Sequence, residues 1–252
     1  MPFDLKTRLK NKETLIGSLV TLGSADVAEL MSFVGFDYLW IDAEHAPLDF
    51  AQIQRMIQAV GGRCPCIVRV PENREVWIKK ALDTGCDGII APQVRTGEEA
   101  RSLVRWSLYP PEGERSVGIS RAQGYGMNFE EYLGQANDKL VIVAQAEHIE
   151  GVRNIKAIAA TPGLDAVLTG PYDLSGSLGI PGKIKHPQVE EAISEVKKHC
   201  EQAGVSVGIF TTDSDSARAY ADEGYNLIAL GLDTFFLRDA AKKALKQAKT
   251  KG

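Results

Sequence analysis

Several features of common protein classes are missing from this sequence. Only four of the 252 residues are cysteines, and none lies in a Cys-x-x-Cys pair or at another zinc-ligand spacing, so we expect neither a disulfide framework nor a zinc centre. No run of 18 apolar residues is present, and the start MPFDLKTRLKNKE lacks the apolar stretch of a secretory signal. These absences predict a reduced cytoplasmic protein without a transmembrane helix.

The sequence also lacks a large excess of either charge. It contains 29 Lys and Arg residues against 33 Asp and Glu residues, for a formal net charge of −4. Because nucleic acids and anionic membranes are bound through strongly basic surfaces, we expect neither as a partner. No P-loop, no Gly-x-Ser-x-Gly elbow and no lysine at the end of an apolar run is present, which argues against nucleotide, serine-hydrolase and Schiff-base chemistry.

What is present is a regular alternation of apolar and amphipathic segments. Eight short runs rich in Val, Ile and Leu are typical of buried parallel strands, at residues 15–22, 37–44, 64–70, 88–94, 139–147, 164–170, 206–210 and 226–232. Amphipathic helical patterns separate them. Eight strand–helix units in about 250 residues predict an α/β fold, a single TIM (β/α)8 barrel over residues 1–252. An open doubly wound sheet is the alternative, but no Gly-x-Gly-x-x-Gly follows the first strand.

Helix ends and one long connection add detail to this barrel. Ser24, Asp49 and Asn73 stand where helix N-caps are expected. Residues 110–138 interrupt the alternation with five glycines, and NFEEYLGQAN within them predicts a short extra helix. A connection of this length in a compact domain is usually functional or mobile, and a loop at a subunit interface is the simpler interpretation.

Polar and ionisable side chains follow the predicted strands where each strand ends. In a TIM barrel these carboxyl ends share one rim, which carries the active site. The second predicted strand leads into Asp42, Glu44 and His45, and strand alternation places the two acids on one face. The same alternation pairs Gln145 with Glu147 after the fifth strand. The other rim candidates are Arg69 after the third strand and Gly170, Pro171, Tyr172 and Asp173 after the sixth.

Glu147 and Asp173 are candidates for a metal site. Two carboxylates from neighbouring strands would repel each other and raise the pKa of one of them, and a hard divalent cation removes that repulsion. Mg²⁺ typically takes one or two carboxylates and leaves its other positions to water and substrate oxygens. The alternative is that one of these acids caps a helix or pairs with a lysine.

His45 and Arg69 are candidates for catalysis. A carboxylate beside His45 would orient the imidazole and raise its basicity, as a general base needs, whereas a histidine satisfied at the rim is the structural alternative. A guanidinium at the end of an apolar strand needs an anionic partner. For Arg69 that partner is either a developing oxyanion on a substrate or a rim acid such as Asp42 or Glu44.

Six segments together resemble the HpcH/HpaI aldolase family. They are WIDAEHAP (40–47), VRVPEN (68–73), APQV (91–94), YPPEGERSVG (109–118), QAEHIEGVRNI (145–155) and GPYDLSGSLG (170–179). They occur in the family's order and spacing over nearly the whole chain. The family consists of class II pyruvate aldolases, so the resemblance implies a carbon–carbon lyase that depends on a divalent metal ion, Mg²⁺, Mn²⁺ or Co²⁺.

The resemblance also implies roles for individual residues. Glu147 and Asp173 match the family's two metal-ligating carboxylates. His45 matches its general base, and Arg69 matches the arginine that stabilises the enolate oxygen. Gln145 matches a glutamine that contacts the substrate beside the metal.

Further implied roles concern the support of the histidine and the border of the pocket. Asp83 matches an aspartate that raises the basicity of His45, across a subunit interface, and Asp42 and Glu44 are the nearer rivals for that role. Tyr172 stands where relatives often have a small alanine, so we expect it to reshape the substrate-binding segment that also contains Gly170 and Pro171.

The implied reaction is the reversible cleavage of a 4-hydroxy-2-oxo acid to pyruvate and an aldehyde through a pyruvate enolate held by the metal. Family members are typically hexamers that exchange their eighth helix. We therefore expect a homo-oligomer in which Phe235, Phe236 and Leu237 pack on a neighbouring subunit. Two alternatives stay open: a related lyase or synthase that decarboxylates oxaloacetate or condenses it to a citrate-type product, and a non-catalytic barrel that binds a 2-oxo acid.

Overall fold

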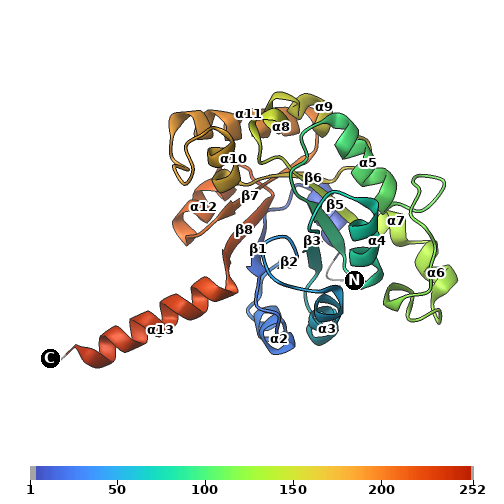
Figure 1. Ribbon diagram of the computed structural model, residues 1–252, viewed down its shortest axis with the longest axis horizontal. Helices are drawn as coiled ribbons and strands as arrows, with labels where there is room; N and C mark the ends of the chain where they lie inside the picture. The colour runs from blue at the N-terminus through green and yellow to red at the C-terminus, as the bar shows by residue number, and fades with distance from the viewer. Residues whose placement is uncertain (1–3, 251–252) are drawn as a thin grey trace.

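A closed barrel of eight parallel strands lies at the centre of the computed structural model, which describes residues 4–250 (Figure 1). Each strand pairs with the next, and β8 pairs back with β1. The strands are β1 (Leu15–Val20), β2 (Tyr38–Asp42), β3 (Cys66–Arg69), β4 (Gly88–Ala91), β5 (Val141–Gln145), β6 (Ala166–Thr169), β7 (Ser206–Thr211) and β8 (Leu227–Leu232). The predicted TIM barrel is therefore confirmed. The alternative prediction, an open doubly wound sheet, is wrong because hydrogen bonds join β8 to β1. The predicted domain of residues 1–252 extends beyond the described residues at both ends.

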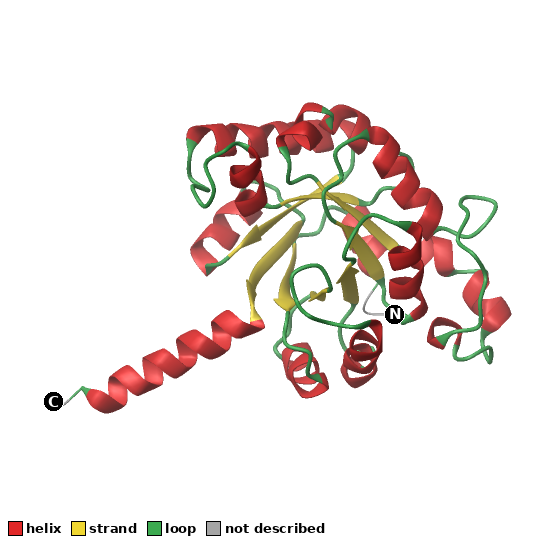
Figure 2. Cartoon of the chain, viewed as in Figure 1, coloured by secondary structure: helices red, strands yellow, loops and turns green. Residues whose placement is uncertain are grey.

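Helices alternate with the strands and cover most of the outside of the barrel (Figure 2). They are α1 (Leu5–Lys10), α2 (Ala25–Phe33), α3 (Phe50–Val60), α4 (Glu75–Asp83), α5 (Gly97–Ser107), η1 (Arg121–Gln123), α6 (Phe129–Leu133), α7 (Ala136–Lys139), α8 (Ile149–Arg153), α9 (Ile155–Ala159), α10 (Pro171–Ser177), α11 (Pro187–Ala203), α12 (Ser214–Asp222) and α13 (Asp233–Lys249). Within residues 4–250, no helix combines the length and the apolarity that crossing a membrane requires.

Local capping chemistry sets where two of these helices begin. The side chains of Ser24 and Asp49 accept hydrogen bonds from the first turns of α2 and α3, as predicted. The prediction for Asn73 is wrong, because α4 begins later and has no side-chain cap. The amide of Asn73 instead donates to the carbonyl oxygen of Glu99, 3.1 Å away on α5.

The strands separate two apolar cores. Inward-facing residues fill the barrel with aliphatic side chains and two large aromatic ones, Tyr38 and Trp40. Outward-facing residues pack beneath the helices, which contribute side chains at helical spacing such as Ile53 and Met56 of α3. A Cβ on Gly17 would lie 2.5 Å from the ring of Tyr38, so a glycine is needed opposite this ring. Burial on both faces explains why the strands are continuous apolar runs.

The amino-terminal end of the barrel is closed, and its acids are individually satisfied. Leu5 and Leu9 of α1 pack against the interior core at this end. An aspartate just before each of β2, β4 and β6 accepts a hydrogen bond of 2.8–2.9 Å from the amide at the start of the preceding strand: Asp37 from Ile16, Asp87 from Cys66 and Asp165 from Ile142. This repeated contact fixes the register of successive strand pairs, and the sequence shows it as Gly-x-Asp at residues 35–37, 85–87 and 163–165.

The long connection between α5 and β5 is anchored at the same end. The predicted extra helix is present as α6 and α7. Arg115 is buried against the rings of Tyr109 and Tyr132, and its Nη2 donates to Asp83 at 3.1 Å. Apolar side chains of the connection are nevertheless exposed: Val117, Ile119, Tyr125 and Met127.

The last helix, α13, projects away from the barrel instead of packing on it (Figure 1). Asp233 is its only buried residue, and Phe236 stacks on Phe36 with ring centroids 6.3 Å apart. Beyond this contact the helix offers exposed apolar side chains, and α2 does the same on the barrel: Leu237 and Leu245, and Leu30, Phe33 and Val34. Both surfaces lack a partner within residues 4–250.

Candidate active site

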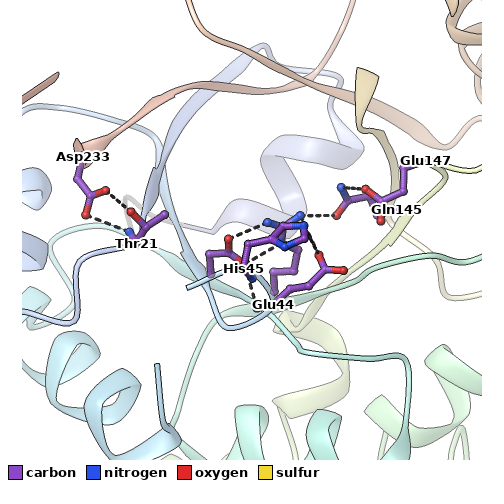
Figure 3. A network of polar contacts seen from close by, with 8 residues as sticks. Thr21, Glu44, His45, Gln145, Glu147 and Asp233 are labelled. Carbon is purple, nitrogen blue, oxygen red and sulfur yellow. Dashed lines mark hydrogen bonds and ion pairs between the residues drawn. The ribbon is translucent and has the colours of Figure 1, made fainter. Parts of the chain in front are cut away.

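Polar side chains form a connected array inside the carboxyl end of the barrel. Asp42 ends β2, Arg69 ends β3 and Gln145 ends β5, and each is at most 5% exposed. Arg69 Nε and Nη2 donate to the two oxygens of Asp42 at 2.8 and 2.7 Å. Nη1 reaches Gln145 Oε1 at 3.5 Å, and Gln145 Nε2 donates to Glu147 Oε2 (Figure 3). The array therefore connects three strands across the mouth.

The turn after β2 brings Glu44 and His45 to the same end of the barrel. Glu44 and Glu147 face the same site as Asp42 and Gln145, as predicted, but β2 ends at Asp42 and β5 at Gln145, so the turns that follow place the two glutamates. Asp42 Oδ1 accepts hydrogen bonds from the amides of Glu44 and His45, at 3.0 and 3.4 Å. Glu44 Oε2 lies 3.0 Å from Arg69 Nη1 and 3.7 Å from His45 Nε2 (Figure 3). The imidazole is 63% exposed at the edge of the mouth.

Arg69 has the rim acids as partners and still keeps a donor available. Asp42 and Glu44, the two partners considered from the sequence, both pair with it. A guanidinium has five N–H groups. Three of them donate to Asp42 and Gln145, and Nη1 also forms an ion pair with Glu44 at 3.0 Å. One N–H of Nη2 has no partner among the described residues, so the group can still bind an oxyanion.

The segment after β6 completes the surroundings of Glu147. Gly170 precedes α10, Pro171 begins it and Asp173 stands in its first turn. A Cβ on Gly170 would lie 2.8 Å from Glu147 Oε2 and would displace it. Glu147 is buried and Asp173 exposed, while Tyr172 is half-exposed. The absence of a side chain at position 170 thus provides the space beside the buried carboxylate.

Negative charge accumulates at this end of the barrel. Burial, together with the carboxylates of Glu44 and Asp173, raises the pKa of Glu147 to about 8, against the lowering effect of the Gln93 amide and Arg69. Burial also raises the pKa of Glu44, which Arg69 and His45 oppose. Binding of a proton or of a cation relieves such a cluster.

The cluster fits a divalent cation that is only partly coordinated by protein. Within residues 4–250, no three His, Cys, Asp or Glu side chains lie close enough together to hold a metal ion by themselves. Glu147 and Asp173 offer two hard carboxylate donors. That number suits Mg²⁺ or a similar ion, which keeps its other positions for water and substrate oxygens.

The backbone of Gln93 is a site group to which sequence reasoning gave no role. Its amide donates to Glu147 Oε1 at 3.0 Å, and its φ of +55° lies in the left-handed region. Arg95 Nη2 donates to the Gln93 side chain at 3.2 Å. Such backbone strain persists where surrounding contacts enforce it, often at functional sites. The only sequence signal is the position directly after Pro92 at the end of a strand.

Asp83 lies away from this array. It is the last residue of α4 and pairs with Arg115. Because the helices run opposite to the strands, the end of α4 lies at the amino-terminal end of the barrel. Within one chain, the acids that contact His45 or its turn are therefore Asp42 and Glu44.

A closed (β/α)8 barrel that buries an arginine, an amide and clustered acids at its carboxyl end has the construction of a TIM-barrel enzyme. Comparison with known proteins specifies the class. The family described as HpcH/HpaI aldolase/citrate lyase matches residues 16–240. The chain belongs to this family and is a carbon–carbon lyase.

Two named aldolases and one crystal structure match nearly the full chain. The hydroxypyruvate/pyruvate aldolase of Paraburkholderia phytofirmans is 36% identical over 254 residues, covering 98% of this chain and 97% of the relative. The 4-hydroxy-2-oxovalerate aldolase of Rhodococcus jostii is 38% identical over 234 residues, covering 92% and 90%. The crystal structure of an HpcH/HpaI aldolase/citrate lyase family protein from Burkholderia cenocepacia has a TM-score of 0.95 and 38% identity, covering 98% of this chain and all of that one.

Proposed function

We propose that the protein is a divalent-metal-dependent aldolase that reversibly cleaves a 4-hydroxy-2-oxo acid to pyruvate and an aldehyde. The observation that carries the proposal is the buried array of Arg69, Gln145 and Glu147 at the mouth of an apolar barrel. Preorganised donors of this kind stabilise negative charge that develops on a substrate oxygen, such as the C2 oxygen of a pyruvate enolate. The names of the two aldolase relatives support the same substrate class.

Glu147 and Asp173 would hold the metal ion, which we expect to be Mg²⁺, Mn²⁺ or Co²⁺. When bound, such a cation polarises the keto group and neutralises enolate charge. The chain itself orients Glu147 through the Gln93 amide at 3.0 Å and through Gln145 Nε2.

His45 and Arg69 would handle the proton and the charge. In the cleavage direction His45 takes the proton of the C4 hydroxyl, and the electrons of the C3–C4 bond move into the enolate as the aldehyde leaves. The free N–H of Arg69 donates to the C2 oxygen while its charge grows. Return of the proton from His45 to C3 gives pyruvate. Glu44, 3.7 Å from His45 Nε2, stabilises the imidazolium in between.

Gly170, Pro171 and Tyr172 would border the substrate on the side of β6. Pro171 and Tyr172 also line a cavity of about 470 Å³ that continues between α11 and α12. We place the aldehyde half beside Tyr172, whose half-exposed phenol limits its size. The substitution Tyr172→Ala should therefore widen the range of accepted aldehydes, measured as relative kcat/KM for short and long aldehydes in the condensation direction.

The active form would be a homo-oligomer, a hexamer, in which α13 packs on the barrel of a neighbouring copy. The exposed apolar residues of α13 and of α2 support this exchange, because each surface would cover the other between copies. Asp83 and the exposed apolar side chains of residues 117–127 lie at the opposite end from His45. If the amino-terminal end of one barrel packs against the carboxyl end of another, Asp83 of one copy comes close to His45 of the next. Mass photometry of the full chain, and of the chain ending at residue 232, tests the exchange.

Deuterium exchange at the pyruvate methyl group, followed by NMR in D₂O, tests the reaction without the unknown aldehyde. We expect exchange with Mg²⁺ or Mn²⁺ and none with EDTA. Consumption of oxaloacetate without aldehyde-dependent condensation of pyruvate would instead indicate the decarboxylase or citrate-type reaction. Tight pyruvate binding without any exchange would contradict the aldolase and indicate a binding barrel.

A further inference from the structure

Trp40 is an unfavourable residue for its position inside the barrel. Its side chain is 1% exposed, and its indole Nε1 has no hydrogen-bond partner among residues 4–250. A buried donor without a partner destabilises the fold. The inward-facing neighbours in register on β1 and β3 are aliphatic, Leu19 and Ile67. An aliphatic residue at position 40 would avoid the penalty, so packing alone does not explain the indole.

The contact with Arg69 does explain it. Arg69 Cζ lies 4.9 Å from the centroid of the Trp40 ring, and both side chains are buried. The attraction between a cation and an aromatic face is strongest when both are removed from water, and tryptophan is the best such face. None of the other inward-facing side chains offers an aromatic ring at this distance from Arg69 in the described chain.

The ring limits a tilt of the guanidinium that its contacts at Nη1 oppose only weakly. Nη1 reaches Gln145 Oε1 at a long 3.5 Å, and its 3.0 Å contact with Glu44 Oε2 is an ion pair without a hydrogen bond. The paired bonds from Nε and Nη2 to Asp42 hold one edge of the guanidinium. Two coplanar bonds resist rotation within that plane but allow the group to tilt about the bonded edge. The indole beneath the group blocks the tilt toward the barrel interior, so the remaining N–H of Nη2 keeps one direction.

We propose that Trp40 is a positioning residue that holds the guanidinium of Arg69 at the tilt required to meet the C2 oxygen of the substrate. The inference rests on the proposed function for the identity of that oxygen, and the Trp40–Arg69 contact is independent of it. Because charge on the oxygen is larger in the enolate than in the bound oxo acid, loss of the ring weakens enolate stabilisation more than substrate binding.

Two substitutions separate positioning from packing. Trp40→Phe keeps an aromatic face, whereas Trp40→Leu matches the aliphatic neighbours. With Mn²⁺ present, we expect Trp40→Leu to lower kcat for pyruvate methyl exchange about tenfold and to weaken binding of oxalate, a planar dianion shaped like the enolate, by a similar factor. KM for pyruvate should change less than threefold, and Trp40→Phe should restore most of kcat. If both variants lose kcat equally and the losses parallel only the decrease in melting temperature, Trp40 has a packing role and the proposal is overturned.

A double-substitution cycle identifies the partner. In an Arg69→Met background the cation is absent, so Trp40→Leu should cause no further loss of exchange rate or oxalate affinity. A full tenfold loss in that background would show that Trp40 acts through another group and would overturn the inference.

Fluorescence tests the contact without any turnover. The chain has three tryptophans, and the pair Trp77→Phe and Trp106→Phe leaves Trp40 as the only one. Arg69→Met should then shift the Trp40 emission, whereas the control Arg101→Met on the exposed face of α5 should not. No response to Arg69→Met would refute the contact and the proposal. If Arg69→Met shifts the emission but the wild-type protein does not exchange pyruvate protons, the proposed function is refuted and the placement of Arg69 by Trp40 is retained.

Discussion

The two ends of the barrel both bury acids, but they surround them differently. At the amino-terminal end Asp37, Asp87 and Asp165 each accept a hydrogen bond from a strand amide, and Asp165 also pairs with buried Lys6 at 3.1 Å. At the carboxyl end Glu44 pairs with Arg69, and buried Glu147 has the carboxylates of Glu44 and Asp173 near it.

The contrast shows that burial alone does not make an acid functional. Burial raises the pKa of Asp165, and Lys6 and the Ile142 amide oppose part of that rise. For Glu147 the contributions next in size are two further carboxylates, which raise the pKa more. An acid with its own donors stabilises the fold, whereas acids that share too few donors keep an affinity for a cation or a proton.

The largest expected effect is a loss of activity that follows replacement of an acid at the carboxyl end but not of one at the amino-terminal end. Glu147→Ala should reduce metal-dependent pyruvate exchange below detection, because one of the two carboxylates proposed to hold the metal is lost, while the melting temperature stays unchanged or rises. Asp165→Asn at the other end should lower the melting temperature and leave the exchange rate per folded molecule intact. Full activity of Glu147→Ala in the presence of EDTA would contradict the metal assignment.

Removal of the guanidinium of Arg69, which Asp42 and Glu44 share, should have the next largest effect. Arg69→Ala is expected to lower kcat by about 10²–10³, the scale of a lost oxyanion donor. Arg101→Ala, which removes an exposed pair with Glu98, serves as the control with unchanged kcat. If kcat of the Arg69 variant equals that of the wild type, the arginine is structural.

The space beside Glu147 can be tested with two glycines of one short segment. Gly170→Ala would place a Cβ 2.8 Å from Glu147 Oε2, and a displacement of this kind should lower exchange by about 10–100-fold. Gly176→Ala within α10 meets nothing within 4 Å. It should keep activity and gain about 0.5–1 kcal/mol of helix stability. Equal exchange rates in the two variants would show that Glu147 does not need this space.

The amino-terminal end should respond in stability alone. Lys6→Met leaves the carboxylate of Asp165 buried without its cation, which should reduce the free energy of unfolding by about 3–5 kcal/mol. Urea titration measures the loss, and the double variant Lys6→Met with Asp165→Leu should recover part of it. Exchange activity at 25 °C is expected to persist in both. A loss of activity without a loss of stability would link this end to catalysis.

The smallest effect is a pH dependence of the metal-free protein. Since the pKa of Glu147 is raised to about 8 in the fold, the folded state binds this proton more tightly than the unfolded chain. The contribution of Glu147 to stability is therefore greatest below its ordinary pKa and declines as the pH rises toward 8. Melting temperatures from pH 5 to 8.5 should fall more in the wild type than in Glu147→Gln. Saturating Mn²⁺ should remove the difference, and parallel curves without metal would contradict the raised pKa.

Much of the barrel was predictable because its signals are local. Each predicted strand run overlaps an observed strand, and the polar residues after the second, third, fifth and sixth runs do lie at the carboxyl end. The cap at Asn73 failed because a distant carbonyl, that of Glu99, competes for its amide. Asp42 and Glu44 face the same arginine, and Gln145 contacts Glu147, as predicted. The second member of each pair nevertheless lies two residues beyond its strand, so a turn places it and not strand alternation.

The order and period of apolar residues determined the barrel, its eight units and the end at which the polar residues collect, since strand and helix periodicity act over a few neighbouring residues. The partners of those residues were decided only in three dimensions. Asp42 and Arg69 lie 27 positions apart, and Arg69 and Gln145 lie 76 apart. The left-handed amide of Gln93, the ring of Trp40 beneath Arg69 and the place of Asp83 at the far end have no local signature. Closure of the barrel brings distant strand ends within hydrogen-bond distance, and only then does an acid become satisfied or remain in need of a cation.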